Sequence, residues 1–392
     1  MNKRKSIIER TLVGCALLLL LAAVPAAAQQ PRITNAKLET RSAAGGLTPA
    51  FRSIVSALAA PAWIAYAVPA APGRHQMCCY DYVGRDRAPM GGGCCRLEEK
   101  SDGVDIRSGD EGEKNRNVAL EGPAFICVFY RVDTQTVRKI RMFSQECQID
   151  AGGRTVYWLS EVRGAESVDL LSTFVREEHW ASRKAAVSKD EDADDDDDDD
   201  NDGESAGHAA IAAIALHADP AADAALERFV APAQQESLRK QAAFWLGIER
   251  GRRGYEVLRR MVHDDPSDRV REQAIFALSQ SRVPEAVDAM IDTARNDRSS
   301  HVRGQALFWL AQRAGRKAQL AITAAIEDDP ETDVKKKAVF ALSQLPRDEG
   351  VPLLIQVARS NRNPVVRKQA IFWLGQSNDP RALNFFEEVL RP

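Results

Sequence analysis

The chain has 392 residues, and its 53 Lys and Arg against 56 Asp and Glu give a formal net charge of −3. A hydrophobic fraction of 44% is ordinary for a globular protein, which argues against wholesale disorder and against a multi-span membrane protein. The nearly balanced charge gives no electrostatic reason to expect a nucleic-acid partner.

Residues 1–28 have the composition of a secretory signal. A basic segment precedes the apolar run Leu12–Val24, and three alanines before Gln29 form a small-residue cleavage site. The run has 13 residues, too few to cross about 30 Å of hydrocarbon as a helix. We therefore expect an exported protein, periplasmic or extracellular, with no stable membrane span after cleavage. An uncleaved anchor is the alternative.

Residues 29–187 predict a small β-rich α+β domain. Four segments are strand-like: Ala62–Val68, Phe125–Val132, Thr136–Phe143 and Arg154–Leu159. The second and third of these are separated by a short turn and predict a hairpin. The segment from Ser167 to Val187 has a helical pattern.

Six cysteines remain after signal removal, all in this domain: Cys78, Cys79, Cys94, Cys95, Cys127 and Cys147. An even number of clustered cysteines in an exported protein predicts disulfides and no free thiol. Neighbours on a strand point to opposite faces, so each adjacent pair can bridge in two directions, and the connectivity stays open. A four-thiolate metal site is the alternative. Zinc ligands are usually two to four residues apart, so the spacing favours disulfides, and we expect no metal or cofactor.

Residues 188–205 predict an acidic, disordered linker between two halves that fold separately. The unbroken run Asp194–Asp200 repels itself and stays solvated. The residues Asp198, Asp200, Asp202 and Gly203 also match the opening of an EF-hand calcium loop. The twelfth position of that loop should be Glu but is Ala209, which favours the linker.

Residues 206–392 repeat with a period of 32 residues. The repeat-core column is Leu238, Val270, Val302, Val334 and Val366. Each member is followed by Arg or Lys at the next position, Ala four on, Phe six on and Leu eight on. The pattern predicts two helices per unit, a first helix such as Asp268–Gln280 and a second helix after Pro284, stacked into an α-solenoid. Residues 206–235 are a degenerate capping unit.

This pattern resembles HEAT-like repeats of the armadillo-type α-solenoid class. Asp265, Asp297 and Asp329 stand five residues before the Val, as in that family, and Asn361 departs from it. The resemblance implies a scaffold that binds macromolecules along an extended surface, with the second helices on its concave face. It implies no particular activity.

Three columns of the repeat have two interpretations each. Trp245, Trp309 and Trp373 alternate with Ala277 and Ala341 seven residues after the Val, which predicts interdigitated core packing rather than a row of binding tryptophans. The Phe column predicts packing between adjacent first helices, and the alternative is an apolar ladder offered to a partner. The basic column predicts ion pairs with the Asp of a turn that join neighbouring repeats.

No catalytic motif is present, so we predict a non-catalytic adaptor that binds another envelope or extracellular protein. The candidate partner-binding residues lie on the polar second helices: Arg259, Arg260, Asp288, Asp292 and Arg359. One alternative is an enzyme or ligand-binding protein with its site near the cysteines of the N-terminal domain. Another is a structural protein of the cell envelope.

Overall fold

The computed structural model describes residues 30–72, 95–98, 124–177, 206–313 and 315–391. The expected signal segment, the acidic linker with its calcium-loop match, and Cys78, Cys79 and Cys94 lie outside these residues.

The N-terminal part contains a mixed five-stranded sheet with the strand order β2-β7-β3-β4-β5. Its strands are β2 (Lys37–Ser42), β3 (Ala62–Pro69), β4 (Phe125–Asp133), β5 (Thr136–Ser144) and β7 (Thr155–Ser160). β7 runs parallel to β2 and β3, and β4 is antiparallel to both β3 and β5. A separate parallel pair consists of β1 (Arg32–Thr34) and β6 (Gln148–Asp150).

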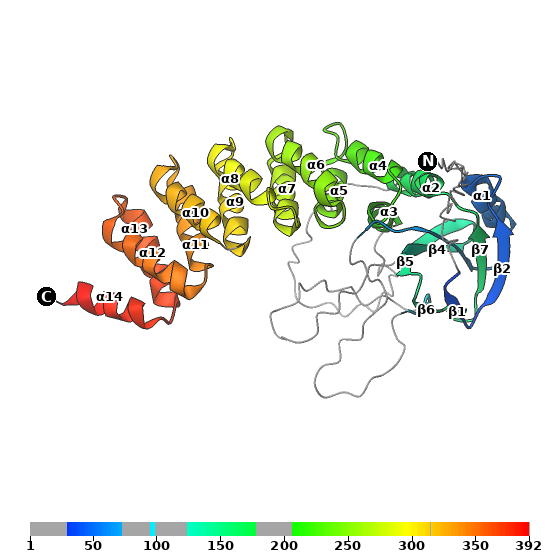
Figure 1. The fold of residues 1–392 in the computed structure, drawn as a ribbon, viewed down its shortest axis with the longest axis horizontal. Helices are drawn as coiled ribbons and strands as arrows, with labels where there is room; N and C mark the ends of the chain where they lie inside the picture. Colours follow the sequence, from blue (N-terminus) through cyan, green and yellow to red (C-terminus); the bar gives the residue numbers. More distant parts are fainter. Residues whose placement is uncertain (1–29, 73–94, 99–123, 178–205, 314, 392) are drawn as a thin grey trace, which may run out of the picture.

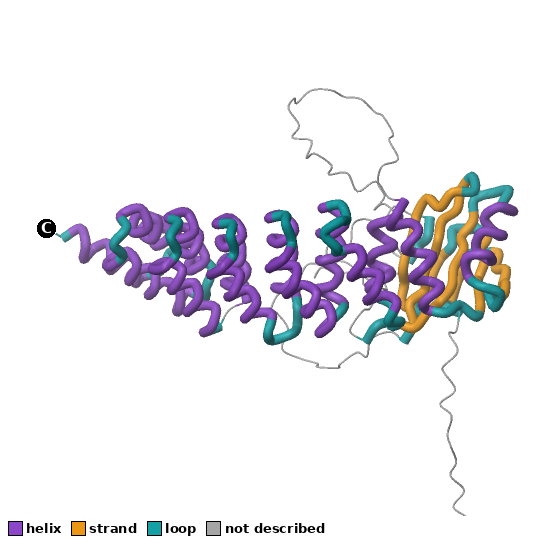
Figure 2. Tube along the Cα trace, turned by 90° about the horizontal axis from the view of Figure 1, so that it is seen from above, coloured by secondary structure: helices purple, strands orange, loops and turns teal. Residues whose placement is uncertain are grey.

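Side chains alternate across this sheet and build two cores. On β3 and β4, Tyr66 and Tyr130 face the helices α1 (Leu47–Ala57) and α2 (Gly164–Glu177), while Trp63 and Phe129 belong to the cluster on the opposite face. Figures 1 and 2 show the helices on one side of the sheet.

The four strands and the hairpin expected from the sequence are confirmed. The hairpin turn places Thr134 and Gln135 at positive φ. The helix expected from Ser167 begins at Gly164, and the described part ends at Glu177. The sequence interpretation missed β1, β2, β6 and α1.

The C-terminal part is all helical. We call the helices that carry the Val and Arg columns the Val-Arg helices: α5 (Glu236–Glu249), α7 (Asp268–Gln280), α9 (Ser300–Arg313), α11 (Thr332–Ser343) and α13 (Pro364–Gln376). Between them run the connecting helices: α4 (Ala221–Phe229), α6 (Gly251–Asp264), α8 (Ala286–Asn296), α10 (Arg316–Asp328) and α12 (Arg347–Ser360). The array begins with α3 (Ala206–Ala215) and its last described helix is α14 (Pro380–Leu390).

The helices form two layers along a curved row (Figure 1). Neighbouring Val-Arg helices contact one another extensively along the array, whereas neighbouring connecting helices make few contacts. Adjacent units of a curved stack are closest on its inner side. The Val-Arg helices therefore form the inner layer, and their solvent-facing side is called the inner face below.

The sheet and the array are joined through α3. This helix packs on α2 and β5 as well as on α5, and its residues Ile211 and Ile214 are fully buried. One hydrophobic cluster runs from the helix-covered face of the sheet through α3 to the far end of the array. The two parts thus share one core, in contrast to the separately folding halves expected from the acidic linker.

Candidate functional site

The repeat-core column fixes how the Val-Arg helices are oriented. Its members are all buried: Leu238, Val270, Val302, Val334 and Val366. Because these positions face the connecting helices, the residues two, three, six and ten positions further along the helix turn toward the inner face.

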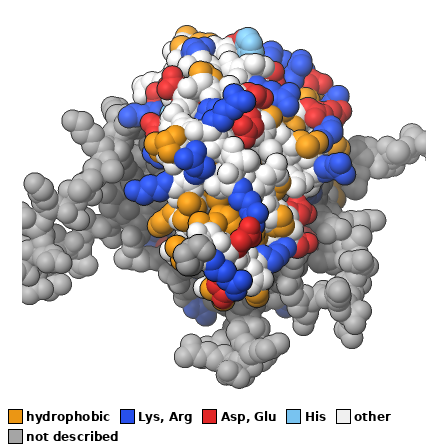
Figure 3. All heavy atoms as spheres, turned by 90° about the vertical axis from the view of Figure 1, so that its left-hand side faces the viewer, with side chains coloured by type: hydrophobic (Ala, Val, Ile, Leu, Met, Phe, Trp, Pro, Cys, Tyr) orange, Lys and Arg blue, Asp and Glu red, His pale blue; other side chains and the backbone are white. Residues whose placement is uncertain are grey.

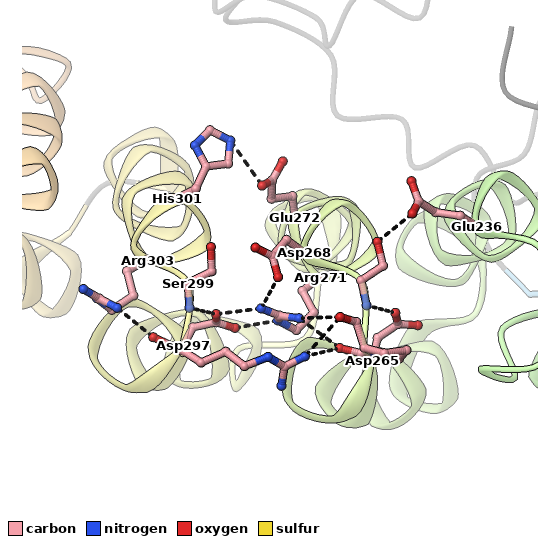
Figure 4. A network of polar contacts seen from close by, with 12 residues as sticks. Glu236, Asp265, Asp268, Arg271, Glu272, Asp297, Ser299, His301 and Arg303 are labelled. Atoms are coloured by element: carbon pink, nitrogen blue, oxygen red, sulfur yellow. Dashed lines mark hydrogen bonds and ion pairs between the residues drawn. The ribbon is translucent and has the colours of Figure 1, made fainter. Parts of the chain in front are cut away.

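Arginines of the basic column tie successive units together. The ion pairs are Arg239–Asp265 at 2.9 Å, Arg271–Asp297 at 2.8 Å and Arg303–Asp329 at 2.8 Å. Each arginine thus reaches the Asp of the next turn, as the sequence predicts, and Figure 4 shows the pair of Arg271 and Asp297. Hydrogen bonding to Asp297 raises the pKa of Arg271, and hydrogen bonding to Asp329 raises that of Arg303.

The ladder of ion pairs changes at the fourth repeat unit. Lys335 replaces Arg and donates to the carbonyl of Glu327, while Asn361 replaces Asp and donates to the Glu327 carboxylate. This joint between α11 and α13 therefore has hydrogen bonds where the three preceding joints have a buried, bidentate ion pair.

Aromatic side chains form a continuous ladder across five Val-Arg helices. The order of contact is Trp245, Phe244, Phe276, Trp309, Phe308, Phe340, Trp373 and Phe372, with successive ring centroids 4.8 to 6.2 Å apart. Phe244 stacks on Phe276 and Phe308 stacks on Phe340. The Phe column thus packs between adjacent helices of one layer, as expected.

The same ladder remains partly open to solvent. Its rings are half-buried, apart from Phe372, which is 53% exposed. The tryptophans predicted to be repeat core are also half-buried, and Ala277 and Ala341 are fully buried between them. Core packing and an exposed apolar surface therefore coexist in one set of rings.

A groove of about 640 Å³ opens on this inner face at α9, α11 and α13. It is lined by Ser300, His301, Asp333, Lys336, Lys337, Phe340, Gln369 and Trp373. A smaller cavity of about 240 Å³ also contacts Trp373 and extends toward α12. The indole N–H of Trp373 is buried and has no hydrogen-bond partner among the described residues. This groove thus lies where the ion-pair ladder changes.

The sequence interpretation missed the polar residues of this groove. The position three residues after the repeat-core residue is Gln in four units and Lys337 in the remaining unit. The side chain of Lys337 packs against Gly304 of the preceding Val-Arg helix, where a Cβ atom would lie 2.2 Å from the Cδ atom of Lys337. The single Lys in this column of Gln was the signal from which the sequence could have indicated the groove.

The five partner-binding candidates lie on connecting helices, as predicted, and all are exposed. Asp288 pairs with Lys317 at 2.8 Å, and Arg359 pairs with Glu388. These candidates form the layer opposite the inner face, and their role in binding stays a prediction.

The expectation that every cysteine is paired is wrong for Cys95 and Cys127, which are free thiols. Cys127 lies on β4 within the apolar cluster of Trp63, Phe129 and Phe143, where neighbouring side chains fill the space around it. Burial raises the pKa of its thiol to about 12. Cys147 is buried in the same cluster.

A polar cluster of the N-terminal part surrounds Glu98. Its carboxylate accepts from the indole N–H of Trp63 at 2.6 Å and pairs with Arg131 at 3.0 Å and Arg154 at 3.3 Å. Each carboxylate oxygen therefore has a partner, as in a structural ion-pair network. Among the described residues, no group of three His, Cys, Asp or Glu is placed to hold a metal ion. No helix in the described ranges is long and apolar enough to cross a bilayer.

A family model for HEAT repeats matches residues 222–311 and 320–392. The C-terminal part of this chain is a HEAT-like repeat array. Both matches begin on connecting helices, α4 and α10, whereas the sequence interpretation began each unit on a Val-Arg helix. Counted from a connecting helix, the second helices of the units are the Val-Arg helices, which form the inner layer.

Parts of the chain are also similar to solved structures. Human deoxyhypusine hydroxylase in complex with glycerol is 16% identical, with 57% of this chain and 90% of that chain covered and a TM-score of 0.24. The CpcE and CpcF complex of phycocyanin lyase from Nostoc sp. PCC7120 is 24% identical over 40% of this chain and 99% of that one, with a TM-score of 0.31. Kap121p is 13% identical over 57% and 27% of the two chains, with a TM-score of 0.34. No curated protein matches the chain.

Proposed function

We propose that this chain is an exported, non-catalytic scaffold whose HEAT-like array binds another envelope or extracellular protein on its inner face. The proposal rests on the aromatic ladder, which presents half-buried rings along five Val-Arg helices. Aromatic side chains that are already packed lose little conformational entropy when a partner covers them, and they are enriched at protein interfaces.

The inner face fits a protein partner better than the connecting helices do. The five candidates on the connecting helices are all charged and exposed, and such rim charges affect orientation and association rate more than affinity. The inner face combines apolar rings with Gln and Lys side chains, which gives the apolar centre and polar rim of a specific interface.

Site-specific photo-crosslinking tests this surface. A benzoylphenylalanine residue would replace Gln305 on the inner face in one variant and Arg259 on α6 in a matched control variant. We expect an adduct with an envelope protein only from position 305. An adduct from position 259 alone would contradict the proposal.

Export is a separate part of the proposal and rests on the signal-like sequence of residues 1–28. Intact-mass analysis of the protein recovered from the cell envelope tests it. We expect a chain that begins at Gln29, and a mass that still includes residues 1–28 would contradict cleavage.

A further inference from the structure

The aromatic ladder contains the same ring pair twice. The rings of Phe276 and Trp309 lie 4.8 Å apart, and those of Phe340 and Trp373 lie 4.9 Å apart. The second pair follows the first by 64 residues in the sequence, which is two units of the repeat. We call the first pair the proximal aromatic site and the second the distal aromatic site. The groove described above belongs to the distal site.

The charges around the two sites are opposite. The distal site is lined by Asp333, Lys336 and Lys337, which sum to +1. The equivalent positions 64 residues earlier are Arg269, Glu272 and Gln273, and Glu236 stands where the distal site has Ser300. One Arg and two Glu sum to −1, so two sites with equal rings carry charges of opposite sign.

Ion pairs inside the array do not cancel this difference. At the distal site, Asp333 neutralises Lys336 at 3.0 Å, but the Lys337 ammonium contacts the His301 ring at 3.0 Å and no carboxylate among the described residues. At the proximal site, Arg269 lies 3.9 Å from Glu236, which also accepts from Ser267 at 2.8 Å, and Glu272 lies 3.2 Å from His301. Figure 4 shows Glu236, Glu272 and His301 on the same side of three successive Val-Arg helices.

We propose that the inner face binds one extended segment of a partner protein through two apolar side chains about six residues apart, one beside an acidic residue and the other beside a basic residue. The acidic end of the partner segment lies at the distal site beside Lys337. The basic end of the segment lies at the proximal site beside Glu236 and Glu272. The spacing follows from geometry: two steps between packed helices are about 20 Å, which an extended chain covers in about six residues. This inference rests on the proposed function and specifies its partner.

The acidic run of this chain does not fit this description. Residues 190–204 contain no large apolar side chain and carry charge of one sign. Such a segment would make no apolar contact with the aromatic rings, and the glutamates of the proximal site would repel it.

Fluorescently labelled synthetic peptides of about 12 residues, assayed by anisotropy with the whole chain, test the proposal. The first peptide has two Leu six residues apart, one flanked by Glu and the other by Arg. Three matched peptides change one feature each. In one, Glu flanks both Leu residues; in another, Arg flanks both; in the last, the two Leu residues are only three positions apart. We expect the first peptide to bind at least about tenfold more tightly than each of the others, which corresponds to about 1.4 kcal/mol.

A charge-swap variant separates specificity from folding. Lys336→Glu with Lys337→Glu leaves the rings in place, and both side chains lie at the surface, so the array should remain folded, as circular dichroism would verify. We expect this variant to prefer the peptide with Arg at both Leu. The control variant, Arg259→Glu with Arg260→Glu on α6, should bind all peptides as the natural chain does.

Equal binding of the four peptides, or an unchanged preference after the charge swap, would overturn this inference. If a crosslink from position 305 still forms in that case, the inner face binds its partner by other chemistry and the proposed function survives. If the crosslink is also absent, both are wrong.

Discussion

The Nε2 atom of His217 lies 2.7 Å from the Oγ atom of Ser167, and this contact joins the segment that follows α3 to α2. The other ring nitrogen, Nδ1, lies 2.7 Å from the carbonyl of Ala213 and therefore carries the proton, so Nε2 accepts from Ser167. Ser167 in turn lies 2.7 Å from the hydroxyl of Tyr66, which is 2.6 Å from that of Tyr130. All four side chains are fully buried, so the sheet, α2 and the end of α3 share one hydrogen-bonded chain.

His217 should make stability fall in mildly acidic solution. Burial lowers the pKa of its ring to about 4, although the hydrogen bond to the Ala213 carbonyl and the charge of Asp219 act to raise it. Because this pKa lies below the unfolded value near 6.5, the neutral ring stabilises the fold fully above about pH 6.5, and that contribution is lost as the pH falls toward 4. Relative to His217→Gln, the natural chain should lose up to about 3 kcal/mol of unfolding free energy over this window. Urea denaturation at a series of pH values measures it, with His263→Gln, an exposed position, as control. Parallel curves for the natural chain and His217→Gln would contradict the assignment.

The shared core predicts that cleavage between the two parts does not separate them. A site-specific protease sequence would be inserted between Lys189 and Asp190, outside the described residues. Because α3 buries Ile211 and Ile214 against the sheet part and the first repeats, we expect both fragments to elute together in size-exclusion chromatography. They should separate only in denaturant. Two fragments that elute apart in native buffer would show that the parts fold independently.

The sequence predicts the array better than the N-terminal part, for a physical reason. The position of Val270 recurs in five units, so the sequence shows the same buried environment five times. The helix Asp268–Gln280 was therefore predicted with its observed ends. The strand β2 gave no signal because it lies at the sheet edge and its side chains are mostly exposed. The joining role of α3 was also missed. Its Ala-rich sequence is buried all round, so it lacks the one-sided pattern by which a capping helix is recognised.

The order of the two helices in a unit could not be decided by periodicity. A repeat of two helices has the same period whichever helix is called first, and only the packing shows which layer is inner. The candidate site was therefore assigned to Arg259 and its neighbours, whereas the aromatic groove lies on the other layer. The Phe column itself had been recognised as the alternative surface.

Arg271 should be the most costly residue of the ion-pair ladder to remove. Its side chain is fully buried and its partner, Asp297, is 5% exposed. Arg271→Met leaves a buried carboxylate unpaired, and we expect a loss of about 3–5 kcal/mol in unfolding free energy. Arg359→Met breaks a pair that is half-exposed, with exposed fractions of 50% and 62%, and should cost about 0–1 kcal/mol. Guanidinium denaturation of both variants compares them, and similar losses would mean that the ladder does not stabilise the stack.

Cys95 and Cys127, the free thiols among the described residues, should differ in reactivity. Cys127 is buried in an apolar cluster that raises its thiol pKa to about 12, and the thiolate is the reactive form. Cys95 is half-buried and more accessible. With iodoacetamide at pH 8, we expect Cys95 to be alkylated in the native protein and Cys127 only after unfolding, as peptide mass spectrometry would show. Alkylation of Cys127 in the native state at the rate of Cys95 would contradict the packing of β4.

Two equivalent glycines of the repeat should respond to alanine with opposite signs. Gly247 on α5 faces α7 so closely that a Cβ would lie 2.4 Å from the carbonyl oxygen of Ala277. Since backbone atoms cannot swing away, Gly247→Ala must push the two inner helices apart, and we expect a loss of about 1–3 kcal/mol. Gly375 occupies the corresponding position on α13, where nothing lies within 4 Å of a Cβ. There Gly375→Ala should gain up to about 1 kcal/mol, because alanine restricts the unfolded chain and favours the helix. Thermal unfolding of the two variants measures both effects. Equal shifts in the melting temperature would show that α5 and α7 are not in close backbone contact, and the close spacing of the inner layer would then be wrong.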